Sequence, residues 1–528
     1  MVDGQTNQEW KPNHNPWLIA LVVALAAFLE VLDTSINNVA LPHIAGDLGA
    51  SQDQSTWVLT TYLVANAIVL PITGWISSFL GRKRFFMICI GLFTVASLFC
   101  GIAPSLPVLL CFLAFQGAAG GGLQPMSQSI MADSFPPKLR GAAFALFGMT
   151  VVGAPALGPI LGGWITDNYT WRWIFLMNLP IGLLVLVLVV RFVEDPPYLL
   201  RLKPGEMRFD SVGFSLLALG VLALQVLLDK GQEDDWLASH FINSLIAIAV
   251  VSLGTLIVWE WRQKQPIVDV RLFKSVNFSG ACLTMFLAGA VMFSSMVLMP
   301  EFLQMLMGYT AEDAGLVVSI GSALVMVTMP IVGFLASRIP AKYLIAFGWF
   351  LSAGGLYEST KLLSMNISFG GAAVIILLQF APLAFIFLPA ITASYIGIPL
   401  DKSNSVAGLT NFMRNIGMSF GTAAVQTILA RRQQFHLARI ADHLSLGSPG
   451  LAINAQAMAL HSRSAGLGVT GTQAAILARI YRSFMMQAST LSFIDAYVIL
   501  GIGSVAMFFI SFLLKSNDPK ATEQHSGH

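Results

Sequence analysis

Charged residues are scarce in this 528-residue chain. Lys, Arg, Asp and Glu together make up 11% of it, hydrophobic residues make up 56%, and the mean hydropathy is +0.73. A soluble domain carries roughly 25% charged residues. The composition therefore excludes a soluble globular protein and indicates a polytopic membrane protein.

Other features that would indicate an enzyme or a pump are missing too. The sequence contains no Gly-x-x-x-x-Gly-Lys loop, so a primary ATP pump is excluded for this chain alone. The basic residues are dispersed, which gives no sign of a polyanion partner. The four cysteines lie in apolar runs without metal-ligand spacing, and we interpret them as small buried hydrophobes. We expect no catalytic constellation, no metal site and no cofactor.

Long apolar runs predict an all-α protein with fourteen transmembrane helices. These runs lie near residues 17–41, 56–78, 84–103, 107–131, 140–166, 172–193, 210–229, 240–262, 278–302, 312–338, 342–364, 370–398, 405–431 and 492–514. The polar start of the chain lacks a cleavage site before the first run, which predicts a retained helix rather than a signal peptide. The distribution of Lys and Arg places both termini in the cytoplasm.

An internal repeat divides the chain into two halves. "LPITGWISSFLGRK" (70–83) aligns with "MPIVGFLASRIPAK" (329–342), and a second pair of blocks upstream has the same offset. Such repeats are typical of transporters whose substrate site lies between two halves near the membrane midplane. We expect a cytoplasmic tail (1–16), an N-terminal six-helix half (17–193), two linker helices with their loops (194–277), a C-terminal half (278–514) with a long outer loop (432–491), and a cytoplasmic tail (515–528).

Two carboxylates interrupt the first apolar run, in "AAFLEVLDTSINNVALP" (26–42). Glu30, Asp33 and Asn37 project from one face of the predicted helix. An acidic residue at the centre of a membrane helix costs about 2.5 to 3.5 kcal/mol, so carboxylates placed there are functional candidates. The alternative is a polar contact between helices that serves packing alone, and this applies to Asn37 in particular.

Four stretches together resemble the major facilitator superfamily, in its fourteen-span drug:proton antiporter branch of the EmrB and QacA type. They are "LDTSINNVALP" (32–42), "GWISSFLGRKR" (74–84), "GAPALGPILGG" (153–163) and "GLTNFMRNIGMSFGTA" (408–423). The resemblance covers nearly the whole chain. It implies the major facilitator fold, two six-helix halves plus two extra helices, and exchange of substrate for protons without a cofactor.

The resemblance also implies roles for particular residues. The second stretch matches a cytoplasmic gating loop and the third an antiporter motif that seals the path during reorientation. The loop holds Gly74, Ser78, Gly81, Arg82 and Lys83, and the motif holds Gly153, Pro155, Gly158, Pro159, Gly162 and Gly163. The alternative role for the basic residues of the gating loop is to anchor the topology by contacting anionic headgroups. The fourth stretch places Arg414 inside the membrane, where it needs an anion, water or carbonyls, and Asp33 is a candidate partner. Gln116, Gln124 and Asn411 are candidates for the substrate cavity, with a structural role as the alternative for the two glutamines.

Two positions depart from the family pattern. Ser78 stands where the gating loop usually has an acid, and Leu113 where the fourth helix usually has an Arg tied to proton coupling. We interpret Asp133, Glu301 and Glu358, near predicted span ends, as solvated interfacial residues.

We predict a secondary multidrug exporter that exchanges protons for amphipathic drugs or toxic organic compounds across a bacterial inner membrane. Burial favours the neutral form of a carboxylate, and one ionised group disfavours a second beside it. Asp33, assisted by Glu30, is the predicted proton-coupled substrate switch, and a Met- and Phe-rich stretch (285–299) is the predicted adaptable lining, with lipid contact as the alternative.

The long outer loop (432–491) contains amphipathic stretches that predict helices (431–444 and 471–489), and it resembles the corresponding loop of the EmrB-like subgroup. This resemblance implies a periplasmic adaptor and an outer-membrane channel as partners, unless the loop is a tolerated insertion. The alternative function is a facilitator or symporter for a single metabolite or fatty acid with altered proton coupling. A membrane receptor explains the buried carboxylates least well.

Overall fold

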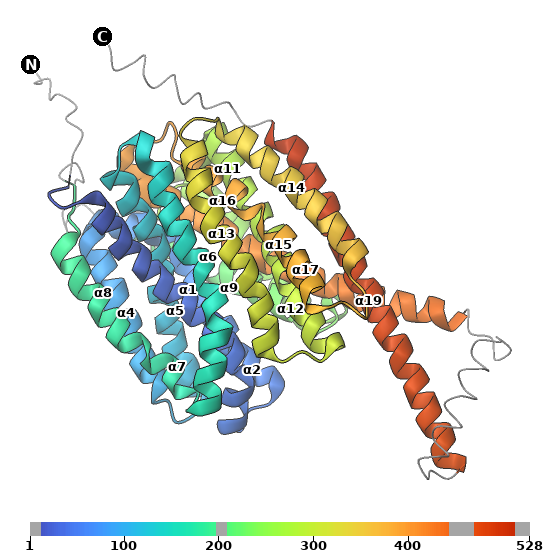
Figure 1. The fold of residues 1–528 in the computed structure, drawn as a ribbon. Helices are drawn as coiled ribbons and strands as arrows, with labels where there is room; N and C mark the ends of the chain where they lie inside the picture. Colours follow the sequence, from blue (N-terminus) through green and yellow to red (C-terminus); the bar gives the residue numbers. More distant parts are fainter. Residues whose placement is uncertain (1–11, 197–208, 443–468, 513–528) are drawn as a thin grey trace, which may run out of the picture.

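The computed structural model describes residues 12–196, 209–442 and 469–512, and the secondary structure in these ranges is helical (Figure 1). The N-terminal helices are α1 (Pro16–Asp47), α2 (Gln52–Val69), α3 (Thr73–Leu80), α4 (Arg82–Gly101), α5 (Leu106–Ser134), α6 (Pro137–Asn168), α7 (Arg172–Leu176) and α8 (Asn178–Phe192). Two further helices follow, α9 (Ser211–Lys230) and α10 (His240–Arg262). The C-terminal helices are α11 (Val276–Ala288), α12 (Ser294–Met307), α13 (Ala311–Ala336), α14 (Ala341–Leu362), α15 (Phe369–Phe380), α16 (Leu383–Ser394), α17 (Ser403–Asp442) and α19 (Val469–Ser511). Short 3₁₀ or π turns connect several of them, such as Leu70–Ile72 between α2 and α3 and Gly289–Phe293 between α11 and α12.

Within the described ranges, twelve helices or helices in series are long and apolar enough to cross a membrane. They correspond to the predicted spans apart from 342–364 and 405–431. Helices α14 and α17 occupy those two stretches but are not among the twelve. Both nevertheless lie within the bundle, since α14 packs against α19 and α17 packs against α5 and α11.

Local signals fix where helices begin and end. Ser51 and Gln54 form a reciprocal capping box at the start of α2, so two of the backbone donors there are satisfied. Gly81 has φ +84° between α3 and α4, a conformation that an L side chain rarely adopts. The predicted turn at Gly81 is therefore confirmed, and Gly49, with φ +63°, follows the end of α1 in the same way.

The bundle has two ends, which we name after these turns. The Gly81 end contains the turn between α3 and α4 and the start of α17, and the Gly49 end contains the turn between α1 and α2. Helix α1 begins and α19 ends on the same side of the bundle (Figure 1). The N-terminal helices pack mainly on one another, and α6 and α5 join them to α13 and α17 of the second half.

The predicted outer loop 432–491 is largely helical where the structure describes it. Helix α17 continues to Asp442 and α19 begins at Val469, while residues 443–468 lie outside the described residues. Both helices extend away from the bundle (Figure 1). The candidate membrane span within α19 is Tyr481–Ser511, which includes most of the last predicted span and begins before residue 492.

Candidate functional site

Helix α1 carries the polar groups at the centre of the candidate site. Glu30, Asp33 and Asn37 are 5%, 1% and 2% exposed. Helical spacing brings them to one side of α1, and Asn37 Nδ2 donates to Asp33 Oδ2 over 3.2 Å. The predicted burial of both carboxylates is confirmed, so their surroundings must supply hydrogen-bond donors.

Asp33 is surrounded by amide donors of the N-terminal half. Gln116 Nε2 on α5 donates to Oδ2 over 3.1 Å, and Asn178 Nδ2 on α8 donates to Oδ1 over 2.5 Å. Asn178 also donates to Ser97 Oγ of α4 over 3.0 Å, which fixes the direction of its amide. Hydrogen bonds to the charged form favour it and so offset part of the cost of burial.

Glu30 has a second set of donors that reaches the other half of the molecule. Asn66 Nδ2 on α2 donates to Oε1 over 3.1 Å, and Gln124 Nε2 on α5 donates to Oε2 over 2.5 Å. The carbonyl oxygen of Gln124 accepts from Nη2 of Arg414, on α17, over 2.6 Å. Gln124 therefore links a carboxylate of one half to a cation of the other.

Arg414 contacts Gln124 in the structure rather than its candidate partner Asp33. The guanidinium is buried and bonds to Gln124, which in turn bonds to Glu30. Nearby, Asn411 Nδ2 donates to Gln128 Oε1 over 2.9 Å, and Asn415 Nδ2 donates to Asn66 Oδ1 over 3.1 Å. Amide pairs from α17 thus accompany Arg414 along the junction between the halves.

Sequence reasoning missed five of these partners: Asn66, Ser97, Gln128, Asn178 and Asn415. All five lie inside predicted spans, where a polar side chain in an apolar run is a usable signal. The signal does not say which helix face the residue occupies or which carboxylate it reaches. Gln116 and Gln124, left open between site and structural roles, each contact a carboxylate.

Buried charges and hydrogen bonds close the Gly81 end. Arg82 forms an ion pair with Asp133, with side chains only 1% and 2% exposed, and its Nη2 donates to Ser403 Oγ of α17 over 2.8 Å. Asn404 Nδ2 donates to Ser77 Oγ over 2.7 Å. Removing one partner of such a buried pair costs about 3 to 5 kcal/mol, because the other charge is left uncompensated.

One interpretation of this end needs correction. Asp133 is not a solvated interfacial residue, because it is buried against Arg82. The Ser78 hydroxyl donates to Trp75 O of its own helix over 2.7 Å, so the acid that meets the loop comes from α5 instead. Gly74 lies against α17, where an added Cβ would come within 2.9 Å of the Ser405 Cα, and Lys83 Nζ donates to Val190 O over 2.7 Å.

The glycines of the predicted antiporter motif let α6 pack closely on two sides. A Cβ at Gly158 would meet the Ser35 hydroxyl and lie 2.5 Å from the Ser35 Cβ of α1, and one at Gly162 would meet Ile36 at 3.2 Å. Gly153 faces Met326 of α13, across the junction between the halves. Helix α6 therefore packs at once on the helix of the carboxylates and on the opposite half.

Of the other motif residues, Pro155 contacts α1 and Gly163 faces open space. Pro155 O accepts a hydrogen bond from Ser35 Oγ over 3.4 Å, while a Cβ at Gly163 would meet nothing within 4 Å. The side chain of Pro159 lies outside the described residues, and α6 is helical through both prolines.

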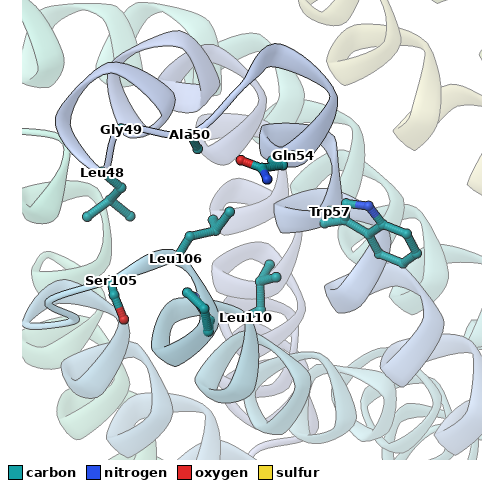
Figure 2. A pocket seen from close by; sticks show the side chains of 9 residues that line it. Leu48, Gly49, Ala50, Gln54, Trp57, Ser105, Leu106 and Leu110 are labelled. Carbon is teal, nitrogen blue, oxygen red and sulfur yellow. The ribbon is translucent and has the colours of Figure 1, made fainter.

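A cavity of about 420 Å³ opens at the Gly49 end (Figure 2). Its lining is mainly apolar and comes from the α1–α2 turn, α2 and the start of α5: Leu48, Gly49, Ala50, Gln54, Trp57, Ser105, Leu106, Pro107 and Leu110. Leu113 lies one turn further along α5, is fully buried in an apolar cluster, and precedes Gln116 by another turn. Apolar packing therefore stands where the family pattern has a cation.

Known proteins match this chain over most of its length. A sequence model of the Major Facilitator Superfamily matches residues 23–422. The chain is 38% identical over 469 residues to the multidrug export protein EmrB of Escherichia coli (strain K12), covering 88% of this chain and 90% of that protein. It is 38% identical over 427 residues to the fatty acid resistance protein FarB of Neisseria gonorrhoeae, covering 81% and 83%. Among solved structures, the proton:xylose symporter XylE has a TM-score of 0.61 at 13% identity, covering 96% of this chain and 97% of that one, a likeness of fold alone.

Proposed function

The chain belongs to the major facilitator superfamily as a multi-pass membrane protein of the EmrB-like multidrug exporter family, and on that premise we propose that it exports amphipathic toxic compounds in exchange for protons. The likeness to EmrB of Escherichia coli supports export of drugs. The buried carboxylates Glu30 and Asp33 support the exchange, because each can bind and release one proton inside the membrane.

One observation carries the coupling proposal: Gln124 bonds both to Glu30 and to Arg414 of the other half. A charged Glu30 attracts the amide donor of Gln124 and, through it, orients the amide carbonyl toward the guanidinium. Protonation removes that charge and weakens the link between the halves. Proton binding thus changes the relative stability of the two arrangements of the halves, as exchange requires.

Asp33 performs a different task in this proposal. Its donors come from α1, α5 and α8, so it belongs to the N-terminal half alone. We assign it the site at which the proton and the substrate compete, with Glu30 transmitting the outcome to Arg414. Protonation of both groups removes the negative charge that attracts a cationic substrate, and deprotonation restores it.

The state described here is closed at the Gly81 end by Arg82, Asp133 and Ser403. We propose that this end faces the cytoplasm, with both termini on the same side and fourteen spans in all, α14 and α17 included. The basic residues Arg82, Lys83 and Arg84 support this orientation. The site is then reached from the periplasm in this state.

The length of helices α17 and α19 is evidence for a protein partner on the periplasmic side of a bacterial inner membrane. At 40 and 43 residues they are about twice as long as a membrane requires. Asp495 on α19 bonds to Arg432 and His436 of α17 over 2.6 Å each, which holds the base of the extension together. We propose that the extension binds a periplasmic adaptor that leads to an outer-membrane channel.

A second candidate substrate class is favoured by Arg414. A buried guanidinium can bind a carboxylate, and the likeness to the fatty acid resistance protein FarB points to the same chemistry. In an exporter of fatty acids or other amphipathic weak acids, the substrate carboxylate would bind Arg414 and would compete with Glu30 for that cation.

A panel of substrates in proteoliposomes distinguishes these candidates. An imposed proton gradient with an internal pH dye reports proton movement when lipophilic cations or fatty acids are added. Proton flux driven by cations supports drug exchange, and flux driven only by the acids supports the second class. Movement of labelled substrate without proton flux would contradict both exchange mechanisms and would indicate a facilitator.

A further inference from the structure

Linker helix α9 lies between the two halves rather than beside one of them. It packs against α2 of the N-terminal half and against α17 of the C-terminal half. Near the Gly81 end α17 packs directly on the 3₁₀ turn and α3 that follow α2. The described side-chain hydrogen bonds of α9 to α2 and α17 lie toward the Gly49 end, so α9 occupies the seam between α2 and α17 there.

Polar side chains on all three helices meet along this seam. Beginning at the site, Asn66 bonds to Glu30 on one side and to Asn415 on the other, over 3.1 Å each. One turn further along α17, Ser419 Oγ accepts from Gln225 Nε2 of α9 over 2.6 Å. The seam therefore continues the polar surroundings of Glu30 onto the linker helix.

The same line of polar groups reaches the surface at the Gly49 end. Asp229, one turn after Gln225, accepts a hydrogen bond from the Thr60 hydroxyl of α2 and is exposed on its other side. Lys230 Nζ donates to Thr56 Oγ1 over 2.9 Å and pairs with Glu233 over 2.6 Å. Asp229 is thus a carboxylate at the mouth of the seam, with Lys230 and Glu233 as the charged groups nearest to it.

The spacing between these groups fits bridging by water. Residues four apart on a helix are about 5 to 6 Å apart at their Cβ atoms, a gap that one water spans with two hydrogen bonds. This applies to Gln225 and Asp229 and to Asn415 and Ser419. Gln225 is 5% exposed, and its Oε1 has no hydrogen-bond partner among the described residues, as a group that binds a bridging water would.

We propose that this line of side chains is the route by which protons travel from the Gly49 end to Glu30, with Asp229 as the proton-accepting group at its mouth. The inference rests on the proposed proton exchange and adds the path to it. A proton from bulk water forms an O–H bond on the Asp229 carboxylate and leaves it for a water in the seam. Successive waters, positioned by Gln225, Ser419 and the two asparagines, pass one proton on until it binds a Glu30 oxygen. The amide groups keep their own protonation throughout.

The test compares Asp229→Asn with Asp234→Asn in the full-length protein in proteoliposomes. Asp234 is exposed in the turn after α9, so the control makes the same chemical change beside the route. Tetraphenylphosphonium and laurate are the transported probes, and the proton flux that each drives is recorded with an internal dye. We expect Asp229→Asn to slow the flux by about tenfold, since a positioned proton carrier is lost, while probe binding at equilibrium stays within about twofold of wild type.

Buffer dependence distinguishes a proton carrier from a structural role for Asp229. If Asp229 carries protons, mobile buffer in the outer solution replaces it in Asp229→Asn, so the flux of this variant rises with buffer concentration while that of wild type does not. Unchanged flux in Asp229→Asn, or a loss of probe binding in parallel with the loss of flux, indicates a structural role and overturns the proposal. An absence of probe-driven flux in wild type instead contradicts the proposed exchange itself.

Two further variants test the mouth and the middle of the route without removing a charge. Thr60→Val removes the hydroxyl that holds Asp229, and Gln225→Leu removes the group that positions water beside Ser419. We expect slower flux in both with unchanged probe binding, and recovery in Thr60→Ser. Wild-type flux in Gln225→Leu would show that protons reach Glu30 by another path.

Discussion

At the scale of single residues, the site depends on neutral amides placed around two carboxylates. An amide can donate to a charged carboxylate and accept from a protonated one after reorientation, so both protonation states have partners. Glu30 and Asp33 differ in what their amides contact next, because Gln124, which donates to Glu30, also accepts from a charged group of the other half, Arg414. The division of tasks between the two carboxylates follows from this difference.

Replacing Gln124 with Leu tests that difference. The variant removes a donor from Glu30 and a partner from Arg414 but keeps the volume of the side chain close to the original. We expect substrate-driven proton flux to fall by about tenfold or more, because a hydrogen bond to a charged group contributes about 1.5 to 3 kcal/mol. Gln128→Leu is the matched control: it also removes an amide contact between α5 and α17, but one that contacts no carboxylate. Equal losses in both variants would assign Gln124 to packing alone.

Leu113 supports a prediction about stability. Restoring the family's cation with Leu113→Arg places a charge in a fully buried apolar cluster, while Asp33 already accepts hydrogen bonds from Asn37, Gln116 and Asn178. We expect the free energy of unfolding to fall by about 3 to 5 kcal/mol, the cost of an uncompensated buried charge. The thermal midpoint in detergent measures it, with Leu113→Met as the control of similar volume. An unchanged midpoint would mean that Asp33 can accept a further partner.

At the scale of elements, α6 sets how closely the halves approach each other. Gly158 and Gly162 pack on α1, and Gly153 packs on α13, so one helix transmits the position of the carboxylates to the opposite half. The sequence predicted this packing from the density of glycine and proline. It also predicted the helices, the turn at Gly81 and the burial of both carboxylates, because hydropathy and periodicity report these features directly.

Other features of the elements could not be read from the sequence. Asp133 pairs with Arg82 through burial that depends on how α4 and α5 pack, which no local pattern reports. Asn178 reaches Asp33 because the first residue of α8 lies beside α1. The amphipathic stretches at 431–444 and 471–489 predict helices, but no local pattern reports that each is continuous with a helix of the bundle, as α17 and α19 are.

Two glycines of α6 provide an internal comparison. Gly158→Ala brings a Cβ to within 2.5 Å of the Ser35 side chain, whereas Gly163→Ala meets nothing within 4 Å. We expect the first to lower the free energy of unfolding by about 1 to 3 kcal/mol through overpacking and to slow transport. The second should be neutral or stabilising by about 0.4 to 1 kcal/mol. Thermal midpoints and transport rates measured side by side check both, and equal effects would contradict the assignment of close packing to Gly158.

At the scale of the whole molecule, the halves are joined by buried polar contacts from the Gly81 end to the level of Glu30. Arg82 and Ser403 close that end, and Gln124 and Arg414 join the halves at the carboxylates. Exchange requires that the first set of contacts breaks when the site opens to the other side, so the Arg82–Asp133 pair contributes to the choice of state.

Asp133→Asn is expected to shift the population toward opening at the Gly81 end, because Arg82 loses its charged partner. Spin-label distances between cysteines introduced at the exposed positions Leu139 and Tyr343, in α6 and α14, report that opening. Lys83→Gln is the control at the adjacent position, whose side chain bonds to a backbone carbonyl of the same half. Distances in Asp133→Asn that match wild type would remove the ion pair from the mechanism.

Proton flux from proteoliposomes preloaded with acid tests the central claim most directly. An internal pH dye follows the flux when substrate is added to wild type, to Asp33→Asn and to the double variant Asp33→Asn, Glu30→Gln. The account predicts substrate-driven proton efflux in wild type that is lost in both variants, while the variants remain folded by their thermal midpoints. Efflux that persists at the wild-type rate in the double variant would contradict the assignment of proton exchange to the carboxylates of α1.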